Sequence, residues 1–398
     1  MTPANPSSQK KILFLPRWYP NRTDPMPGLF IERHARAVAI IADVAVVFVK
    51  SLPDMPNRFE IETKQENGVF TIRAYFRGKE TGLGCYNGLL FLAVFIKAML
   101  QLRKTFGQPN IVHVHVLTRL GILAWCYKLL TGTPYLITEH WSRYLPSVAT
   151  YKGFWRKTAT RFVVKHAEAV TVVTQNLCDA MLLHGLKNPN YHVINNVVDT
   201  RQFHPKVIPA NMGIKRFVHI SCFEDRSKNI SGLLRVIAEL AAIRHDFDCR
   251  LVGEGEDLED MRAYALELGI LNKNVHFDGL LEGDAIAASL RQSCFLVIFS
   301  NYENMPVVIN EAFACGIPVV ATRVGGIAEH VDAQKGILID AGDENGLLRA
   351  LSLMLDQSEH YDQKVIRQYA EDNFSGKAVA GQFEAIYSAI MTKTNSKA

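Results

Sequence analysis

Short apolar runs alternate with longer amphipathic segments along most of this chain. Runs rich in β-branched residues predict strands at residues 11–15, 44–49, 70–75, 111–116, 134–138 and 169–173. Between most of these runs, apolar residues recur with helical spacing, as in residues 29–40 and 155–166. Strands that alternate with helices in this way predict a parallel sheet covered by helices on both faces.

The pattern is interrupted once and then starts again. Residues 195–215 are polar, contain two prolines and show no clear period, so we place a domain boundary there. Five further runs predict strands at residues 216–221, 248–252, 274–277, 294–300 and 318–322. The sequence therefore predicts an α/β protein of two Rossmann-like domains that face each other across a cleft, with residues 1–203 in the first. Ligands bind beyond the carboxyl ends of the strands in such sheets, so we expect the chemistry in loops that follow strands.

Composition and charge exclude several classes of protein. With 398 residues, 48% of them hydrophobic and 21% charged, the chain is neither disordered nor fibrous. The net charge is +5, and the charged residues are spread along the chain without runs, so nothing indicates a nucleic-acid-binding protein. A mildly basic protein would suit an anionic membrane surface. The seven cysteines include no Cys-x-x-Cys pair and indicate buried thiols in a reducing compartment. Only four apolar residues separate two lysines from Pro16, too few for a secretory signal, so we expect a cytoplasmic protein.

The segment richest in candidate chemistry is residues 300–331. A strand ends at Ser300, a loop carries Glu303, and Pro306 suits the first turn of a helix because it lacks an N–H. Glu311 then lies about 7 Å further along the helix axis, at ~1.5 Å per residue. A helix start attracts phosphate, so a nucleotide sugar would fit with its sugar on Glu303 and its ribose on Glu311. The alternative is a loop carboxylate and an ordinary solvated helix glutamate, and the spacing alone does not decide between them.

The sequence around these glutamates resembles the signature of glycosyltransferase family 4. The family pattern E-x-x-P-x-x-x-x-E-A-x-A-x-G-x-P-V-V-A-T is matched by Glu303, Pro306, Glu311, Ala312, Ala314, Gly316, Pro318, Val319, Val320, Ala321 and Thr322. Asn304 and Met305 stand where the family often has Gly-Phe-Gly. The resemblance covers essentially the whole chain and implies the GT-B fold, with a donor-binding domain in residues 204–373 and a helix in residues 374–398 that returns to the first domain. It also implies a UDP- or GDP-type nucleotide-sugar donor and transfer with retention of configuration, without a metal or a cofactor.

The resemblance also assigns roles to further residues. Arg226 and Lys228 follow a predicted strand, at the start of the next helix, and match the family's pair that binds the donor phosphates. Basic loop residues otherwise usually face solvent. We expect the donor also to contact Gly28, Gly253, Asn304, Met305, Pro306 and Val307. Gly28 precedes a helix, where a glycine lets the backbone approach a phosphate, or merely forms a turn.

Histidines and aspartates complete the candidate residues. His140 follows a predicted strand and should point toward the cleft, where the family commonly has a functional histidine, although a histidine at a strand end is otherwise more often structural. His113 and His115 share one face of a strand, but no third ligand at metal spacing accompanies them, so we interpret them as packing residues. Asp246 and Asp248 have the Asp-x-Asp spacing of a metal motif but precede a strand. We therefore expect His140, Glu303, Arg226 and Lys228 to be the catalytic set, with no metal site.

The sequence as a whole is interpreted as a retaining, metal-independent glycosyltransferase of the hexosyltransferase type. Its expected acceptor is a glycan or a lipid-linked molecule in polysaccharide or surface-glycan synthesis. A nucleotide-sugar epimerase on the same fold and a non-catalytic sugar-binding protein are the alternatives. Residues 88–100, which Lys97 interrupts, are too short for a membrane span and predict a buried helix. Together with the basic helix at residues 155–166 they also suggest peripheral contact with the inner face of the membrane, although solvated helix faces explain both.

Overall fold

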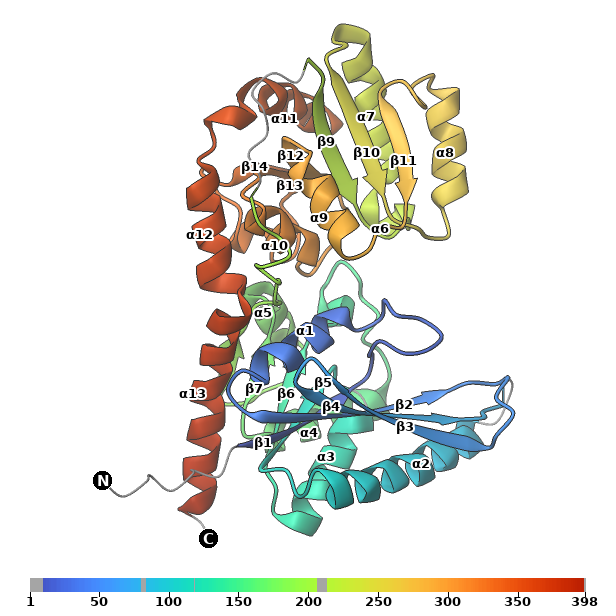
Figure 1. Ribbon diagram of the computed structural model, residues 1–398, viewed down its shortest axis with the longest axis vertical. Coiled ribbons are helices and arrows are strands. Elements are labelled where there is room, and N and C mark those ends of the chain that lie inside the picture. Colours follow the sequence, from blue (N-terminus) through green and yellow to red (C-terminus); the bar gives the residue numbers. More distant parts are fainter. Residues whose placement is uncertain (1–9, 80–83, 118, 206–212, 397–398) are drawn as a thin grey trace.

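The chain forms two α/β domains that are stacked end to end, with the last two helices running along one side of both (Figure 1). A computed structural model describes residues 10–79, 84–117, 119–205 and 213–396. Residues 1–9 lie outside the described part. So do residues 206–212, which belong to the polar stretch where we placed the domain boundary. The two-domain Rossmann-like architecture predicted from the apolar pattern is confirmed.

The first domain is built on an eight-stranded sheet with the order β3-β4-β2-β1-β5-β6-β7-β8. Its strands are β1 (Lys11–Pro16), β2 (Asp43–Ser51), β3 (Phe59–Glu66), β4 (Val69–Phe76), β5 (Ile111–His115), β6 (Tyr135–Glu139), β7 (Val170–Val172) and β8 (Tyr191–Val193). Neighbours are parallel except β3, which pairs antiparallel with β4 and which the sequence pattern did not predict. The expectation of a purely parallel sheet is therefore wrong at this edge.

Helices cover both faces of the first sheet. They are α1 (Leu29–Val38), α2 (Gly84–Thr105), α3 (Arg119–Thr131), α4 (Phe154–His166), α5 (Gln175–Leu183) and, from the C-terminus, α13 (Gly376–Asn395). The central strands β2, β1, β5 and β6 are mostly buried. The reason is that α2, α3, α4 and α5 pack on one face of the sheet, while α1 and α13 pack on the other. Ile31 of α1 and Phe383 of α13 share one core, so the C-terminal helix is part of the first domain's packing.

The second domain has a six-stranded parallel sheet with the order β11-β10-β9-β12-β13-β14. Its strands are β9 (Lys215–Ile220), β10 (Phe247–Val252), β11 (Val275–Gly279), β12 (Phe295–Ile298), β13 (Val319–Thr322) and β14 (Gly336–Ile339). Its helices are α6 (Asp225–Lys228), α7 (Ile230–Ile243), α8 (Leu258–Glu267), α9 (Asp284–Arg291), α10 (Val307–Ala314), α11 (Glu344–Gln357) and α12 (Gln363–Phe374), and three short 3₁₀ turns complete the chain at η1 (Ser142–Tyr144), η2 (Ile327–Glu329) and η3 (Ser358–His360).

The strand order reverses direction between β9 and β12 in the second sheet and between β1 and β5 in the first. At such a switch point the loops after the two central strands diverge to opposite faces and leave a crevice at the carboxyl edge. In the second domain these are the loop from β9 into α6 and the loop from β12 into α10. The topology thus brings two of the segments singled out from the sequence to one place.

Helix α2 differs from the expected buried helix. It is longer than the apolar stretch and buries only one face against the sheet, through Leu90, Phe91, Val94, Phe95, Ala98 and Leu102. Its opposite side exposes Leu89, Leu92, Ile96 and Leu100. Among the residues with assigned structure, α2 is the single helix long and apolar enough to cross a membrane by length and composition. In Figure 1, α2 and α3 lie on the side of the first domain away from the second.

Candidate active site between the domains

Lys228 and Glu303 meet at the switch point of the second sheet. Lys228 ends α6, which follows β9, and its Nζ lies 2.5 Å from Oε1 of Glu303 in the loop after β12. Ser300 Oγ donates to the same carboxylate at 2.9 Å. Only 16% of the lysine side chain and 11% of the glutamate side chain are exposed. The cation and the acid that the sequence predicted on separate loops therefore form one pair.

The charge of Lys228 is maintained despite its burial. Burial acts to lower the pKa of this ammonium, but the negative charge of Glu303 and the polarity of Cys222 and Glu224 outweigh it, so the pKa lies above its usual value. Arg226 is exposed, and its guanidinium has no hydrogen-bond partner among residues that the structure describes. Both residues lie in the four-residue helix α6, the first helix after β9, as expected, and the long helix α7 begins two residues after Lys228.

The segment after Glu303 leads into α10 and contacts the first domain. Pro306 is the N-cap of α10 with ψ of 122°, so the helix begins directly after it, one residue later than the sequence predicted. Met305 is buried, and Val307 begins the helix. Asn304 accepts a hydrogen bond from Thr174 Oγ1 at 2.9 Å and donates one to the carbonyl of His140 at 3.0 Å. The sequence-predicted donor segment therefore lies at the boundary between the domains.

Glu311 is the second acid of the pair and is held by the first domain. It lies on α10 and is 6% exposed. Its Oε1 accepts a hydrogen bond from Nη1 of Arg33, on α1, at 2.7 Å. Arg33 had no signal in the sequence beyond its place on an amphipathic helix. Because Glu303 and Glu311 are both largely buried and ion-paired, neither is the solvated carboxylate of the alternative interpretation.

Two candidate glycines are required by the backbone itself. Gly28 is the N-cap of α1 with φ of 81°, and a Cβ there would lie 2.3 Å from the carbonyl oxygen of Trp18. Gly253 has φ of 137°, and a Cβ there would lie 1.8 Å from the carbonyl oxygen of Ser221. These close approaches explain both glycines without a ligand. A contact of either with a donor phosphate stays a prediction.

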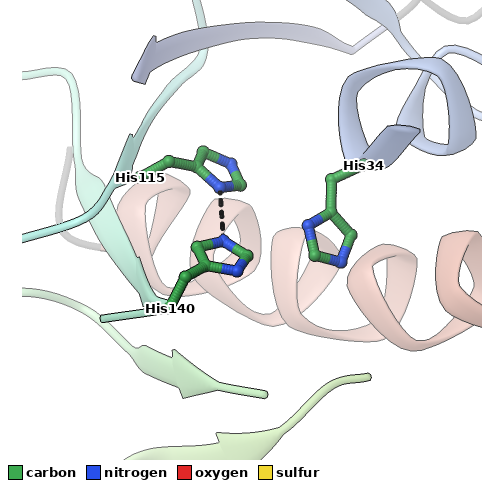
Figure 2. Close-up of side chains that lie close together, drawn as sticks. All are labelled: His34, His115 and His140. Atoms are coloured by element: carbon green, nitrogen blue, oxygen red, sulfur yellow. Dashed lines mark hydrogen bonds between the residues drawn. The ribbon is translucent and has the colours of Figure 1, made fainter. Parts of the chain in front are cut away.

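His140 follows β6, as expected, but its ring packs inward. The centroid of its ring lies 4.6 Å from that of Phe30, with the two planes tilted, and the ring faces His34 and His115 (Figure 2). Its Nδ1 is buried without a hydrogen-bond partner in the described chain. Its backbone N–H and that of Trp141 donate to the carboxylate of the preceding Glu139, a buried acid whose pKa is raised by that burial. The ring is held among side chains of the first domain, and its predicted position toward the cleft and its role in catalysis stay predictions.

A further contact between the domains involves Glu329 and Gly326, which follow the signature in the sequence. Glu329 of η2 accepts hydrogen bonds from the backbone N–H groups of Gln175 and Asn176, both at 2.8 Å, and so caps the N-terminus of α5 in the other domain. Gly326 comes so close that a Cβ there would lie 2.2 Å from Cγ2 of Thr174. The two domains are thus in direct contact around the candidate site.

A cavity lies where α1 faces the segment that links the two domains. Its volume is about 950 Å³, and Arg33, residues 197–203 and residues 281–283 line it. Glu303, Lys228 and Glu311 are not among its lining residues, so the cavity is separate from the cation–acid pair. Cavities of this size hold ligands as large as a nucleotide.

The remaining metal candidates from the sequence have structural partners. Asp246 pairs with Arg244 at 2.7 Å, and Asp248 pairs with Arg216 at 2.9 Å. His113 has partners on both ring nitrogens, Tyr387 and Thr138. These groups are committed to packing and ion pairs, as interpreted from the sequence for His113. His115 is different, because it belongs to the group of Figure 2.

The two domains, the switch-point pair and the acid on α10 define a glycosyltransferase of the GT-B class. Comparison with known families matches residues 35–202 to "Glycosyltransferase Family 4" and residues 200–372 to "Glycosyl transferases group 1". The chain belongs to this family of glycosyltransferases, which transfer a sugar from a nucleotide sugar.

Two curated relatives and one solved structure show how wide the similarity is. The chain is 27% identical to the N-acetyl-alpha-D-glucosaminyl L-malate synthase of Bacillus anthracis over 70% of this chain and 74% of the relative. It is 26% identical to the 2-deoxystreptamine glucosyltransferase of Streptomyces kanamyceticus over 91% of this chain and 98% of the relative. The Anabaena protein HepE, solved in complex with UDP, superposes with a TM-score of 0.72 at 17% identity, covering 95% of this chain and 100% of that chain.

Proposed function

We propose that this glycosyltransferase transfers a hexose from a UDP-sugar, with retention of configuration, to a hydroxyl of a glycan or lipid-linked acceptor at the cytoplasmic face of a membrane. The acceptor would belong to polysaccharide or surface-glycan synthesis. The observation that carries the proposal is the buried Lys228–Glu303 pair, which stands at the switch point of the donor-side sheet. The preference for UDP over GDP rests on the likeness to a fold that was solved with UDP.

The pair supplies both charges that sugar transfer needs. The bond between the anomeric carbon and the phosphate oxygen breaks, the electron pair goes to the diphosphate, and the acceptor oxygen takes its place on the carbon. Lys228, with Arg226 beside it, stabilises the growing negative charge on the diphosphate, so no metal ion is needed for that purpose. Glu303 orients the sugar hydroxyls. The leaving phosphate oxygen takes the acceptor proton, so the site needs no separate base.

The nucleoside end of the donor is placed at Glu311, at the second-domain end of the Arg33 contact. Arg33 pairs with Glu311, the acid expected to hold the ribose, and also lines the cavity described above. A donor with its ribose on Glu311 and its sugar on Glu303 would span the start of α10. The ribose hydroxyls would then share or replace the contact that Arg33 makes in this structure.

The proposal is tested first by nucleotide binding. Thermal shifts with UDP, GDP and ADP should single out UDP, because occupancy at 100 times the dissociation constant stabilises a protein by ~2.7 kcal/mol. Glu311→Ala should lose most of this shift, and Glu303→Ala should keep it. Equal shifts with all three nucleotides, or none, would contradict the assignment of the donor.

Turnover is tested at the lysine. Lys228→Met should lower kcat by about 10²–10³-fold, the usual cost of one charge-stabilising donor, with a smaller effect on the affinity for the intact donor. Arg226→Met, which removes an exposed cation on the same helix, is the matched variant and should cost less. Release of UDP that depends on an added acceptor distinguishes transfer from an epimerase. Unchanged kcat in Lys228→Met would refute the role of the pair.

Membrane contact is supported by one face of the first domain. Besides the exposed side of α2, the start of α4 exposes Phe154 and Trp155, the latter 83% exposed, next to the basic residues Arg156 and Arg161. Apolar side chains next to cations match the interface of an anionic bilayer. A lipid-linked acceptor would be presented at that interface.

Vesicle binding tests this surface directly. The protein should sediment with vesicles containing anionic lipid at low salt, and Trp155→Ser should weaken that binding. Leu266→Ser, which removes a side chain of comparable exposure on α8 of the other domain, is the control and should not change it. Failure of the wild-type protein to bind anionic vesicles would exclude the membrane contact without affecting the assignment of the donor.

A further inference from the structure

Three buried histidines from separate elements of the first domain lie close together. His34 comes from α1, His115 from the end of β5, and His140 from the loop after β6. One ring nitrogen from each lies within 4.8 Å of the corresponding nitrogen of the other two. Figure 2 shows one nitrogen of His34 facing the pair formed by the other two rings.

The hydrogen bonds around the cluster leave its polar atoms incompletely paired. Nε2 of His34 donates to the carbonyl of Asn195 at 3.0 Å, so Nδ1 of His34 carries a lone pair. His115 Nδ1 and His140 Nε2 lie 3.2 Å apart and share a single proton. Buried nitrogens without a partner in the described chain therefore remain on all three rings: Nδ1 of His34, Nε2 of His115 and Nδ1 of His140. Buried polar groups are normally paired, and Nδ1 of His34 is unpaired where it faces the other two rings (Figure 2). His115 Nδ1 and His140 Nε2 would join it as ligands once the proton that they share moves to the outer nitrogen of its ring.

The spacing and the protonation states suit a metal ion. Two nitrogens bound at ~2.0–2.1 Å to one tetrahedral ion lie about 3.3–3.4 Å apart, close to the 3.2 Å between His115 and His140. The hydrogen bonds already assign the protons: Nε2 of His34 donates to a carbonyl, which leaves its Nδ1 with the lone pair that a metal ion binds. The carbonyl that fixes His34 is the kind of outer partner that orients metal-ligating histidines.

We propose that His34, His115 and His140 form a binding site for one divalent transition-metal ion, with Zn²⁺ as the expected ion. Three imidazoles select Zn²⁺, Co²⁺ or Ni²⁺ over Mg²⁺, which prefers oxygen ligands. The site is therefore chemically distinct from a magnesium site for a sugar diphosphate and does not depend on the proposed function. Three protein ligands leave a fourth position for water. The neighbouring His113 is excluded as a ligand because both of its nitrogens are already hydrogen-bonded.

The site would join three parts of the first domain. Its ligands connect α1 to the carboxyl ends of β5 and β6, and the residue before His34 is Arg33, which reaches Glu311 in the second domain. Asn196 in the segment between the domains has a buried side-chain oxygen without a partner in the part of the chain that is described, and it neighbours His140. A bound ion would therefore fix α1 where it meets the second domain.

The test is titration of the full chain, free of any affinity tag, with ZnCl₂ by calorimetry and with CoCl₂ by visible absorption. One equivalent of Zn²⁺ should bind, and Co²⁺ should give the intense absorption of a tetrahedral nitrogen site. His34→Gln and His140→Gln should each weaken binding by more than 100-fold, beyond the roughly 10–100-fold typical of losing an outer partner. His219→Gln is the matched control, since it removes a buried histidine whose two nitrogens are both hydrogen-bonded.

Two results would overturn the proposal. One is the absence of saturable binding of Zn²⁺ or Co²⁺ to the wild-type chain, which needs no variant and so does not depend on how a variant folds. The other is equal affinity in His34→Gln, His219→Gln and wild type, which would assign binding to surface histidines. Circular dichroism and melting temperature, recorded for each variant without metal, show whether a lost site reflects lost structure. Loss of binding in a variant that passes these checks supports the site, and loss only in variants that fail them counts against it.

Discussion

The hydrogen bonds of Asn304 allow the closure of the two domains to be tested by a single substitution. Asn304 accepts from Thr174 and donates to the carbonyl of His140, and both partners belong to the first domain. Each neutral hydrogen bond contributes about 0.5–1.5 kcal/mol net, so Asn304→Ala should destabilise the closed arrangement by about 1–3 kcal/mol. The open population should then rise by about 5- to 150-fold, since each 1.4 kcal/mol is a factor of ten.

Two backbone amides report the opening without being altered by the substitution. The N–H groups of Gln175 and Asn176 donate to Glu329 across the domain boundary, and these bonds are broken when the domains separate. Their hydrogen exchange, followed by NMR or mass spectrometry, should accelerate in Asn304→Ala by the same factor as the open population rises. Amides in the centre of either sheet should keep their rates apart from a small global change.

A matched variant separates domain opening from general loss of stability. Asn87 also makes two hydrogen bonds, accepting from the N–H of Lys79 at 3.0 Å and donating to its carbonyl at 2.9 Å, but both lie within the first domain. Asn87→Ala should therefore leave the exchange of Gln175 and Asn176 unchanged. If Asn304→Ala leaves these amides within twofold of wild type, or if both variants accelerate them equally, the two domains do not close as units through this contact.

Two further predictions concern a close approach and a buried histidine. Gly326→Ala places a Cβ against Thr174 of the other domain, and φ of −90° at this position adds no backbone strain. The domains should therefore be pushed apart, so the radius of gyration in solution scattering should rise and turnover should fall. Gly381→Ala on α13, whose Cβ meets nothing within 4 Å, should change neither, and a compact, active Gly326→Ala would refute the contact. Burial lowers the pKa of His219 to about 4, whereas an unfolded histidine has a pKa of ~6.5. Between pH 7 and 4.5 the unfolded chain therefore binds a proton at this residue that the folded chain does not. The free energy of unfolding should fall by about 2 kcal/mol from this group over that range. Urea unfolding of His219→Gln should lose that part of the pH dependence, and the same slope in both proteins would contradict it.

The strands were predictable where burial is continuous and not where it is one-sided. The central strands β1 and β9 lie between helices on both faces, so their apolar runs identify them to within one or two residues. Strand β3 is an edge strand whose side chains are mostly exposed, and it has no such run. The signal that does exist is the dipeptide Asn67-Gly68, with φ of 50° and 80°, which forms the tight turn of the β3–β4 hairpin.

The candidate site was predictable only in the part that one domain determines. The signature from Glu303 to Glu311 depends on local chain geometry after β12, and the topology then brings Lys228 to it. Arg33 and Glu329 have partners in the other domain, so their roles depend on how the domains are oriented, which no local pattern encodes. The same reason hides the histidine cluster, because His34 is otherwise an ordinary buried position on an amphipathic helix.

Helix α1 explains why Gly28 matters even without a contact to phosphate. Consecutive helical residues point about 100° apart, so Arg33 reaches Glu311 in the second domain while His34 reaches the histidine cluster of the first. Both contacts depend on where α1 begins, and Gly28 sets that position by packing its backbone against Trp18 in a conformation that favours glycine. A side chain at Gly28 would push the start of α1 away from Trp18 and displace Arg33 and His34 together. The glycine that resembles a phosphate-binding residue in the sequence therefore acts here by positioning a helix, and any donor contact would come in addition to that role.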